Sequence, residues 1–169
     1  DGPLDMRMDK EGEDAAALIA RLSEIELARL LWAHGDERDA KRIARAIVQA
    51  RAVAPITTTR QLAALIAKAK PKKPGRETID PATRSFQALR MVVNDEAGEL
   101  DRGLDAALRI LAPGGRLVTV TFHSGEDAVV KEFVNARGGQ VRHPSRHAPP
   151  RTDAPPHLGW LVDRPLRPG

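Results

Sequence analysis

The sequence predicts an α/β fold in which an all-helical region precedes a fragment of a β-sheet. Apolar residues recur every three or four positions through about the first eighty residues, which is the helical period. Farther along, the β-branched run 117–122 and a second apolar run at 158–162 have the length and composition of buried strands. Two strands would leave the edges of an open sheet bare, so we expect further strands from outside this chain.

The composition favours a globular domain without disulfides or metal. The chain has 169 residues, of which 41% are hydrophobic and none is cysteine, and its five histidines show no metal-ligand spacing. No apolar run reaches the roughly 18–20 residues that cross a bilayer, which predicts a cytoplasmic protein without membrane contact. The net charge of +4 permits contact with nucleic acid but does not require it.

Two helices with capping signals are predicted after an N-terminal loop over residues 1–12. Asp14 is the expected N-cap of the first helix. Ser23 and Glu26 match a capping box for the second, which is expected to run to residue 33. Gly35 should then end that helix in the left-handed conformation.

Two more helices are predicted before residue 70. Asp36 is the expected N-cap of the first, and Thr58 with Gln61 forms a capping box for the second. The stretch 71–76, rich in proline and lysine, reads as a loop. The apolar stripe of the first helix is Ile43, Ala46, Ile47 and Ala50.

The helical pattern resumes after residue 79 and then gives way to the sheet. Asp80 is expected to cap a helix that has Pro81 at its first position. The stripe that follows forms one long helix, or two helices that meet near Asn94. A turn at 113–115 leads into the strand 117–122, and a helix over 126–134 precedes the last strand. The stripe is Phe86, Leu89, Val93, Ala97, Leu100, Leu104, Leu108 and Leu111.

Three polar residues at the end of the predicted strand 117–122 are candidate catalytic residues. In open α/β sheets, ligands bind beyond the carboxyl ends of the strands, where His123, Ser124 and Asp127 would lie. The alternative is a local role, in which Ser124 caps the next helix and His123 packs at the end of the strand. Position alone does not decide between these two interpretations.

Basic residues on the helices are candidate contacts to RNA phosphates. Contacts of this kind depend on salt and carry little sequence information. A solvated helix face explains any single cation, whereas the cluster as a whole favours RNA. Aromatic residues make up only 3% of the chain, so a base-stacking platform is not expected. The candidates are Lys41, Arg42, Arg45, Lys72, Lys73, Arg84 and Arg90.

Four stretches, in a fixed order, resemble one protein family. They are DGPLDMRMD at 1–9, AKRIARAI at 40–47, PATRSFQALR at 81–90 with Val-Asn at 93–94, and LAPGGRL at 111–117 leading to Phe-His-Ser at 122–124. In this combination they resemble the bacterial 16S ribosomal RNA cytosine-N4 methyltransferases. The stretches cover most of the first 131 residues, and together they are highly specific.

The resemblance implies a Rossmann-like, S-adenosylmethionine-dependent methyltransferase domain that is interrupted by an all-helical insertion. Residues 1–12 and 80–169 would belong to the methyltransferase domain, and residues 13–79 would form the insertion. The glycine-rich loop and the acidic residues that hold the donor in this family would lie upstream of Asp1. The chain is therefore expected to be a fragment that lacks most of the donor site.

The resemblance also implies a reaction, which is methylation of the exocyclic amine of a cytidine in the decoding region of 16S ribosomal RNA. The partner would be this RNA or the small ribosomal subunit, and a homodimer is left open. Asp5 would accept a hydrogen bond from the amine while Arg7 holds a phosphate; alternatively, the two form an internal pair that shapes their loop. The family usually has Leu and Arg where this chain has Gly125 and Ala128.

Two other functions are considered from the sequence. A non-catalytic RNA- or ribosome-binding module derived from the family would keep the helical insertion and lack the donor site. A helical DNA-binding protein has only the modest basic charge in its favour.

Overall fold

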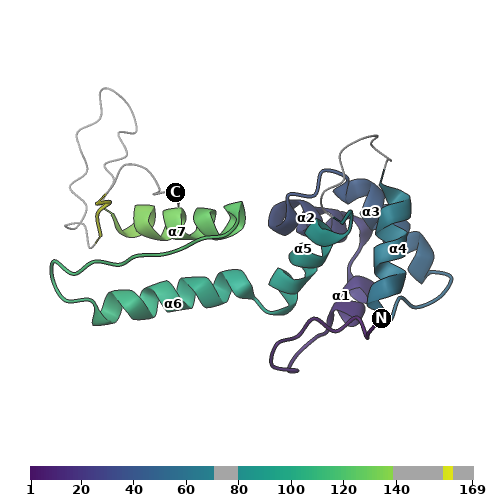
Figure 1. Cartoon of the computed structure of the whole chain (residues 1–169), viewed down its shortest axis with the longest axis horizontal. Coiled ribbons are helices and arrows are strands. Elements are labelled where there is room, and N and C mark those ends of the chain that lie inside the picture. Colours follow the sequence, from purple (N-terminus) through teal and green to yellow (C-terminus); the bar gives the residue numbers. More distant parts are fainter. Residues whose placement is uncertain (71–79, 139–157, 162–169) are drawn as a thin grey trace. The chain divides into compact units, whose positions relative to one another are not determined.

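The computed structural model describes residues 1–70, 80–138 and 158–161, and the chain divides into two compact units. The N-terminal unit is Asp1–Glu96 and the C-terminal unit is Ala97–Gly169. The described residues form seven helices, which are labelled in Figure 1. The described residues contain no β-strand, and the isolated antiparallel bridge between Pro3 and Thr58 is their only sheet-like pairing.

The N-terminal unit is a cluster of short helices around one apolar core. Helix α2 packs against α3 and α5, α3 also packs against α4, and α1 contacts both α3 and α5. The bounds are α1 Ala15–Arg21, α2 Glu24–Gly35, α3 Ala40–Arg51, α4 Thr59–Ala69 and α5 Thr83–Val93. The largest fully buried apolar side chains are Leu4, Ile19, Leu27, Leu31, Ile43, Ile47, Leu62, Ile66 and Leu89.

Three predicted helix starts in this unit are confirmed. The Asp14 carboxylate accepts a hydrogen bond of 2.8 Å from the backbone N–H of Ala17 at the start of α1. Ser23 and Thr58 each form a complete capping box, at the starts of α2 and α4. These caps were predictable because each satisfies free N–H groups within its own first turn.

The end of α2 differs from the prediction. Gly35 is still helical, and Asp36 is the left-handed residue, with φ of 48°. Asp36 is therefore a C-cap rather than the N-cap of α3, which follows Asp39. The physical reason is a close approach to α5, because a Cβ on Gly35 would lie 2.5 Å from the carbonyl oxygen of Arg84. Glycine is required here for packing, while aspartate tolerates the left-handed backbone.

The long apolar stripe forms two helices, one of the two predicted alternatives. Helix α5 ends at Val93, and Asp95 turns the chain with a left-handed φ of 46°. Its start was predicted too early, since Asp80 and Pro81 lie in a turn before the first helical residue, Thr83. The Asp80 carboxylate nevertheless accepts a hydrogen bond of 2.8 Å from Ala82 N–H, so it still serves a backbone donor at this end.

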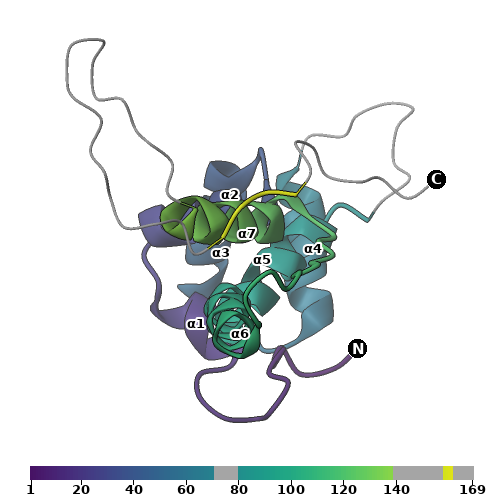
Figure 2. The same ribbon diagram turned by 90° about the vertical axis from the view of Figure 1, so that its left-hand side faces the viewer.

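The C-terminal unit consists of two helices packed along one apolar seam, with the chain between them running back from the end of the first to the start of the second (Figure 1). Helix α6 is Glu96–Ile110 and α7 is Ser124–Arg137; Figure 2 views α6 nearly end-on. The buried residues of the seam are Leu104, Val130 and Phe133, with Leu117 and Leu158 packed beside them.

The predicted strands are not confirmed, since the described residues contain none. Residues 117–122 form an unpaired stretch, and 158–161 form no strand either, while Val162 lies outside the described residues. Burial along 117–122 does not alternate as in a strand, because Thr119 is exposed as well. Leu117 packs against the seam, whereas Val118, Val120 and Phe122 are 85%, 75% and 88% exposed. A strand needs a hydrogen-bonded neighbour, and none is found among the described residues.

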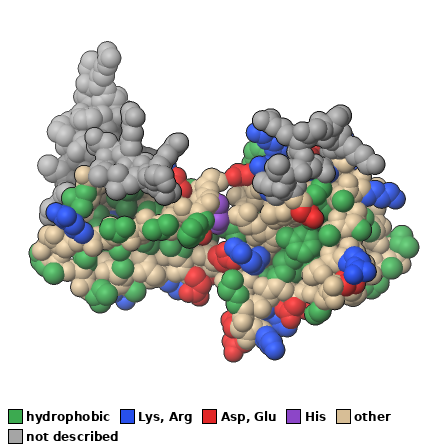
Figure 3. Space-filling view, viewed as in Figure 1, with side chains coloured by type: hydrophobic (Ala, Val, Ile, Leu, Met, Phe, Trp, Pro, Cys, Tyr) green, Lys and Arg blue, Asp and Glu red, His purple; other side chains and the backbone are tan. Residues whose placement is uncertain are grey.

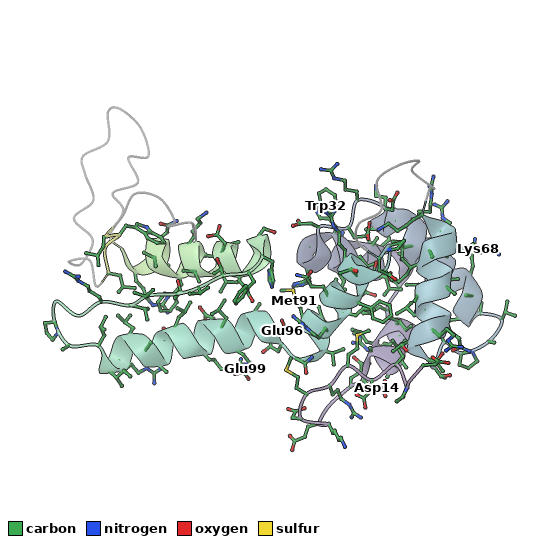
Figure 4. All side chains as sticks on the ribbon, in the orientation of Figure 1. Asp14, Trp32, Lys68, Met91, Glu96 and Glu99 are labelled. Carbon is green, nitrogen blue, oxygen red and sulfur yellow. The ribbon has the colours of Figure 1, made fainter. Side chains whose placement is uncertain are left out.

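Apolar side chains remain at the surface of both units. Figure 3 shows hydrophobic side chains on the visible face of each. In the N-terminal unit, Met8 is 72% exposed in the first loop and Trp32 is 59% exposed on α2, where Figure 4 labels it. Among the described residues, no helix is both long enough and apolar enough to cross a membrane.

Candidate functional site

The first loop of the chain is built around an ion pair between Asp5 and Arg7. Arg7 Nε donates to Asp5 Oδ1 at 2.7 Å, and Arg7 Nη2 donates to Asp5 Oδ2 at 3.0 Å. The backbone N–H of Arg7 also donates to Asp5 Oδ1, at 3.2 Å, and Arg7 Nη1 reaches the carbonyl of Gly12 at 3.0 Å. The fork-like contact fixes the orientation of both side chains and closes the loop.

The electrostatics of the pair keep Asp5 ionised. Hydrogen bonds from the Arg7 side chain and then from its backbone hold the pKa of the Asp5 carboxyl below its ordinary value, and burial opposes them. The same side-chain hydrogen bond raises the pKa of Arg7. The Asp5 side chain remains 34% exposed. The loop therefore presents a partly accessible carboxylate whose ionised form is stabilised by Arg7.

The base of this loop is attached to the helical core by backbone hydrogen bonds. Leu4 N–H donates to the carbonyl of Thr57 at 2.9 Å, and Ala15 N–H donates to the carbonyl of Asp5 at 2.8 Å. The Leu4 side chain is buried in the core of the unit. The position of Asp5 is thus set by the same packing that holds α1 and α4.

Asn94 brings the junction between α5 and α6 against the first loop. Its Oδ1 accepts a hydrogen bond of 2.8 Å from Met8 N–H, and its Nδ2 donates to the carbonyl of Met6 at 2.9 Å. The sequence places Asn94 in a matching stretch and at a helix junction, but it was not predicted as a site residue. Its partners lie 86 and 88 positions away, so no local pattern could have paired them.

His123 and Ser124 lie at the start of α7. His123 is the N-cap: its Nδ1 accepts a hydrogen bond of 3.2 Å from Glu126 N–H, while Ser124 is the first helical residue. The Glu126 carboxylate reaches back to Phe122 N–H at 2.7 Å. The local alternative was therefore right that a side chain caps this helix, but the cap is His123 and not Ser124.

Asp127 and the far side of the His123 ring complete this cluster. Asp127 Oδ2 is 2.5 Å from Lys131 Nζ, one helical turn along α7. His123 Nε2 is buried and lies 3.3 Å from Glu126 Oε1, without hydrogen-bonding geometry. Asp5 belongs to the N-terminal unit and these residues to the C-terminal unit, so each group is a site candidate in its own unit.

The candidate RNA-binding cations fall into two groups. Arg45, Arg84 and Arg90 make contacts within the chain; the strongest is the contact of Arg90 with Glu96, at 2.7 Å and 3.1 Å, and Figure 4 labels Glu96 at the α5–α6 junction. Arg84 donates to the carbonyl of Asp36 at 3.0 Å, and Arg45 lies 3.4 Å from Glu24. Lys41 and Arg42 are exposed on α3.

The remaining RNA-binding candidates, Lys72 and Lys73, lie outside the described residues. The described part of the chain contains no group of three or more His, Cys, Asp or Glu residues arranged to hold a metal ion. A buried polar cluster of Glu37, Lys70 and Ser85 was not predicted from the sequence, because its members are separated by up to 48 positions.

Comparison with known proteins extends over the whole chain. The model of the MraW methylase family matches residues 1–169. Three similar proteins are each named ribosomal RNA small subunit methyltransferase H. The one from Granulibacter bethesdensis is 54% identical over all of this chain and 51% of its own length. Those from Paramagnetospirillum magneticum and Gluconobacter oxydans are 51% and 53% identical, over 96% and 98% of this chain and 50% and 51% of their lengths.

The chain spans about half the length of the curated relatives that it matches. The family match covers every residue, including the loop with Asp5 and Arg7, Asn94, and the start of α7. It agrees with the resemblance seen in the four sequence stretches. The chain belongs to the MraW methylase family.

Proposed function

We propose that the protein containing this chain methylates N4 of a cytidine in the decoding region of 16S ribosomal RNA, with S-adenosylmethionine as the methyl donor. In addition to the family, one observation carries the proposal: the ionised Asp5 carboxylate, fixed by Arg7 and still partly accessible. The relatives' names concern small-subunit ribosomal RNA. If the protein that contains this chain catalyses the same reaction as these relatives, 16S ribosomal RNA is its partner as well.

The chemistry gives Asp5 a specific task. The lone pair of the cytidine amine is delocalised into the ring, so N4 is a poor nucleophile. A carboxylate that accepts a hydrogen bond from the amine raises electron density on N4 and fixes its direction. The low pKa of Asp5 suits this role, because a protonated carboxyl would lose acceptor capacity. In the overall reaction the N4–CH3 bond would form as the S–CH3 bond of the donor breaks, S-adenosylhomocysteine would leave with the sulfur electron pair, and N4 would lose one proton to solvent.

In this proposal, Arg7 has N–H donors left with which to bind an RNA phosphate. A guanidinium carries five N–H groups, and three of them are directed at Asp5 and Gly12. The other two are available to a phosphate. Lys41, Arg42, Arg45, Arg84 and Arg90, together with Lys72 and Lys73, would add phosphate contacts around the helical insertion.

The donor is not assigned to residues of this chain. Nucleotide cofactors are commonly held by a glycine-rich loop after a strand and by a carboxylate on the ribose. Among the described residues, no glycine-rich loop follows a strand, so these residues do not fit such a site. Within the complete Rossmann-like domain, His123, Ser124 and Asp127 would lie at the end of strand 117–122 and face the substrate or donor pocket.

The test is a single-turnover methylation assay with the natural full-length protein, labelled S-adenosylmethionine and small ribosomal subunits. We expect labelled N4-methylcytidine after nuclease digestion and mass spectrometry. Asp5→Asn should lower the rate constant roughly 100-fold, since removal of one preorganised polar group typically costs that much. Glu11→Gln, in the same loop and exposed, is the matched control. A methyl group on another base, or none, would contradict the proposal.

The second candidate is a non-catalytic RNA- or ribosome-binding module. Its support is the helical, basic part of the chain, where Lys41 and Arg42 are exposed on α3. Calorimetry separates the two functions: the natural full-length protein should bind S-adenosylmethionine if it is an enzyme, and only RNA if it is a binding module. The isolated 169-residue chain should bind the donor weakly or not at all, and micromolar binding would show that the donor site is here.

A further inference from the structure

Asn94 makes three hydrogen bonds to backbone atoms, and two of them hold the first loop. Its Oδ1 accepts from Met8 N–H at 2.8 Å, while its Nδ2 donates to the carbonyl of Met6 at 2.9 Å and to that of Arg90 at 2.8 Å. Arg7 lies between the two loop residues that Asn94 holds. The amide thus acts on the backbone on both sides of Arg7.

These contacts use both N–H groups of the Asn94 amide. An asparagine side chain has two N–H donors and one oxygen acceptor. Both donors and one lone pair of Oδ1 are directed at the chain itself. Asn94 therefore has no N–H left to read a base or phosphate, and its action on a bound RNA would pass through the loop.

The loop requires such support because its backbone is strained at the clamped position. Met6 has a left-handed φ of 67°, a conformation that a non-glycine residue adopts only at a cost in energy. Such a conformation persists only where surrounding contacts impose it. The contact from Asn94 to the Met6 carbonyl is one of these, and the ion pair between Asp5 and Arg7 flanks it.

We propose that Asn94 is a positioning residue, which fixes the backbone of Met6 and Met8 so that the Asp5–Arg7 pair faces the RNA amine in one orientation. This inference rests on the proposed function and deepens it. A simpler role would be to cap α5 through the Arg90 carbonyl alone. The two roles differ at Met8, which belongs to the loop and not to the helix.

The experiment compares three variants of the natural full-length protein. Asn94→Ala removes all three hydrogen bonds. Asn94→Asp keeps the acceptor for Met8 N–H but places a carboxylate against the carbonyls of Met6 and Arg90. Asn135→Ala is the control, because Asn135 is the other asparagine of the chain and is exposed on α7. Two quantities are measured: amide hydrogen exchange at Met8, and the single-turnover methylation rate at saturating RNA and donor.

We expect Asn94→Ala and Asn94→Asp to lower the rate constant on the order of 100-fold, which is the effect of misplacing a reacting group by about 1 Å. In Asn94→Ala, protection of the Met8 amide should fall roughly tenfold or more, while the Ala17 amide at the start of α1 keeps its protection. Donor affinity should stay within about twofold, because the donor is expected to bind outside this loop. Asn135→Ala should match the wild type in every measurement.

The outcomes separate this inference from the proposed function. If the wild type methylates 16S ribosomal RNA and both Asn94 variants match Asn135→Ala in rate, Asn94 is not a positioning residue. If Asn94→Ala lowers the rate but leaves Met8 protection unchanged, the effect does not pass through the loop, and the inference is overturned. If the wild type transfers no methyl group to this RNA, the proposed function fails and the role of Asn94 in it fails as well.

Discussion

Lys70 Nζ lies 2.8 Å from Glu37 Oε2, and Glu37 is only 1% exposed although it carries a charge. Lys70 also donates to the carbonyl of Pro81 at 2.9 Å, and Ser85 Oγ lies 3.5 Å from the same carboxylate oxygen. One buried ion pair therefore joins the α2–α3 connection, the end of α4 and the approach to α5. It fixes both Lys70 and Pro81 within the N-terminal unit.

Breaking this pair from one side should strongly destabilise the N-terminal unit. Lys70→Ala leaves the Glu37 carboxylate buried without its cation, which typically costs about 3–5 kcal/mol. The double variant Glu37→Gln with Lys70→Met should cost less, because neither buried charge remains. Urea unfolding followed by Trp32 fluorescence measures both. Glu99→Ala, which removes an exposed ion pair with Arg102, should change stability by less than about 1 kcal/mol.

Gly35→Ala tests the close approach between α2 and α5. An added Cβ would lie 2.5 Å from the Arg84 carbonyl and 3.1 Å from the Ala88 Cβ, so the helices would have to move apart. We expect a loss of about 1–3 kcal/mol in the free energy of unfolding. Gly103→Ala in α6 is the matched control, since its Cβ would meet nothing within 4 Å. That variant should gain roughly 0.5–1 kcal/mol from helix propensity. Equal effects at the two glycines would contradict the packing argument.

The helix ends of the N-terminal unit show which parts of the fold could be predicted. Asp14, Ser23 and Thr58 were predictable as caps because a cap is a contact within one turn. The end of α2 was not, because the reason for Gly35 is the carbonyl of a residue 49 positions later. The stretch 117–122 has the length and β-branched composition of a strand, but pairing depends on a neighbour that the local sequence does not contain.

The candidate site divides in the same way. Asp5 and Arg7 are two positions apart, and an internal ion pair was one of the two interpretations that the sequence left open. Their mutual geometry is observed, while their contact with RNA stays a prediction. Asn94 and the buried Glu37 cluster were missed because their partners are distant in sequence. His123 was predicted as a site candidate, and its capping role emerged only from the position of the Glu126 amide.

The ion pair of Asp5 predicts a specific loss of stability in acid. The pKa of Asp5 is lower in the folded chain than in the unfolded chain, chiefly because Arg7 donates to it. Such a group stabilises the fold fully above its unfolded pKa, near about 3.9, and this contribution is lost as pH falls through the folded pKa. Asp5→Asn should therefore flatten the decline in unfolding free energy that sets in as pH falls below about 5.

Arg7→Gln gives the control for this pH dependence. It removes the main cause of the lowered pKa, so it should flatten the same region of the curve. The double variant should then add little to either single variant, since the two changes remove one interaction. If the effects of Asp5→Asn and Arg7→Gln were additive, the pair would not be the source of the acid sensitivity.

Lys41 and Arg42 should contribute more to RNA binding than Arg90. Both are exposed on α3, and the described residues show no ion pair for either, whereas Arg90 is held by Glu96. Removing one cation from a phosphate should reduce the slope of log K against log salt by roughly 0.7–0.9. Filter binding to 16S ribosomal RNA at several salt concentrations measures this for the single variants Lys41→Ala, Arg42→Ala and Arg90→Ala, and the smallest change is expected for Arg90→Ala. Lys68→Ala, exposed on α4, is the control; an equal change there would indicate a general effect of lower net charge.

The last prediction concerns the stretch 117–122, which we propose as a strand of the complete Rossmann-like sheet. In the isolated chain, Val118, Val120 and Phe122 are exposed and the stretch is unpaired, so its backbone amides should exchange at nearly unprotected rates. In the natural full-length protein, a neighbouring strand should protect them by several orders of magnitude, because ladder hydrogen bonds in a core open only with substantial unfolding.

Val120→Lys tests whether slower amide exchange in the full-length protein reflects pairing of 117–122 in a buried strand. In the isolated chain Val120 is 75% exposed, so the substitution should change stability by less than about 0.5 kcal/mol. In the full-length protein, the same substitution would fall on a buried strand and should destabilise the methyltransferase domain by several times more, because an unpaired charge would be buried. Thr119→Lys provides the comparison on the opposite face of the stretch. Equal tolerance of Val120→Lys in both proteins would show that Val120 faces solvent in the full-length protein and that residues 117–122 do not form a buried strand.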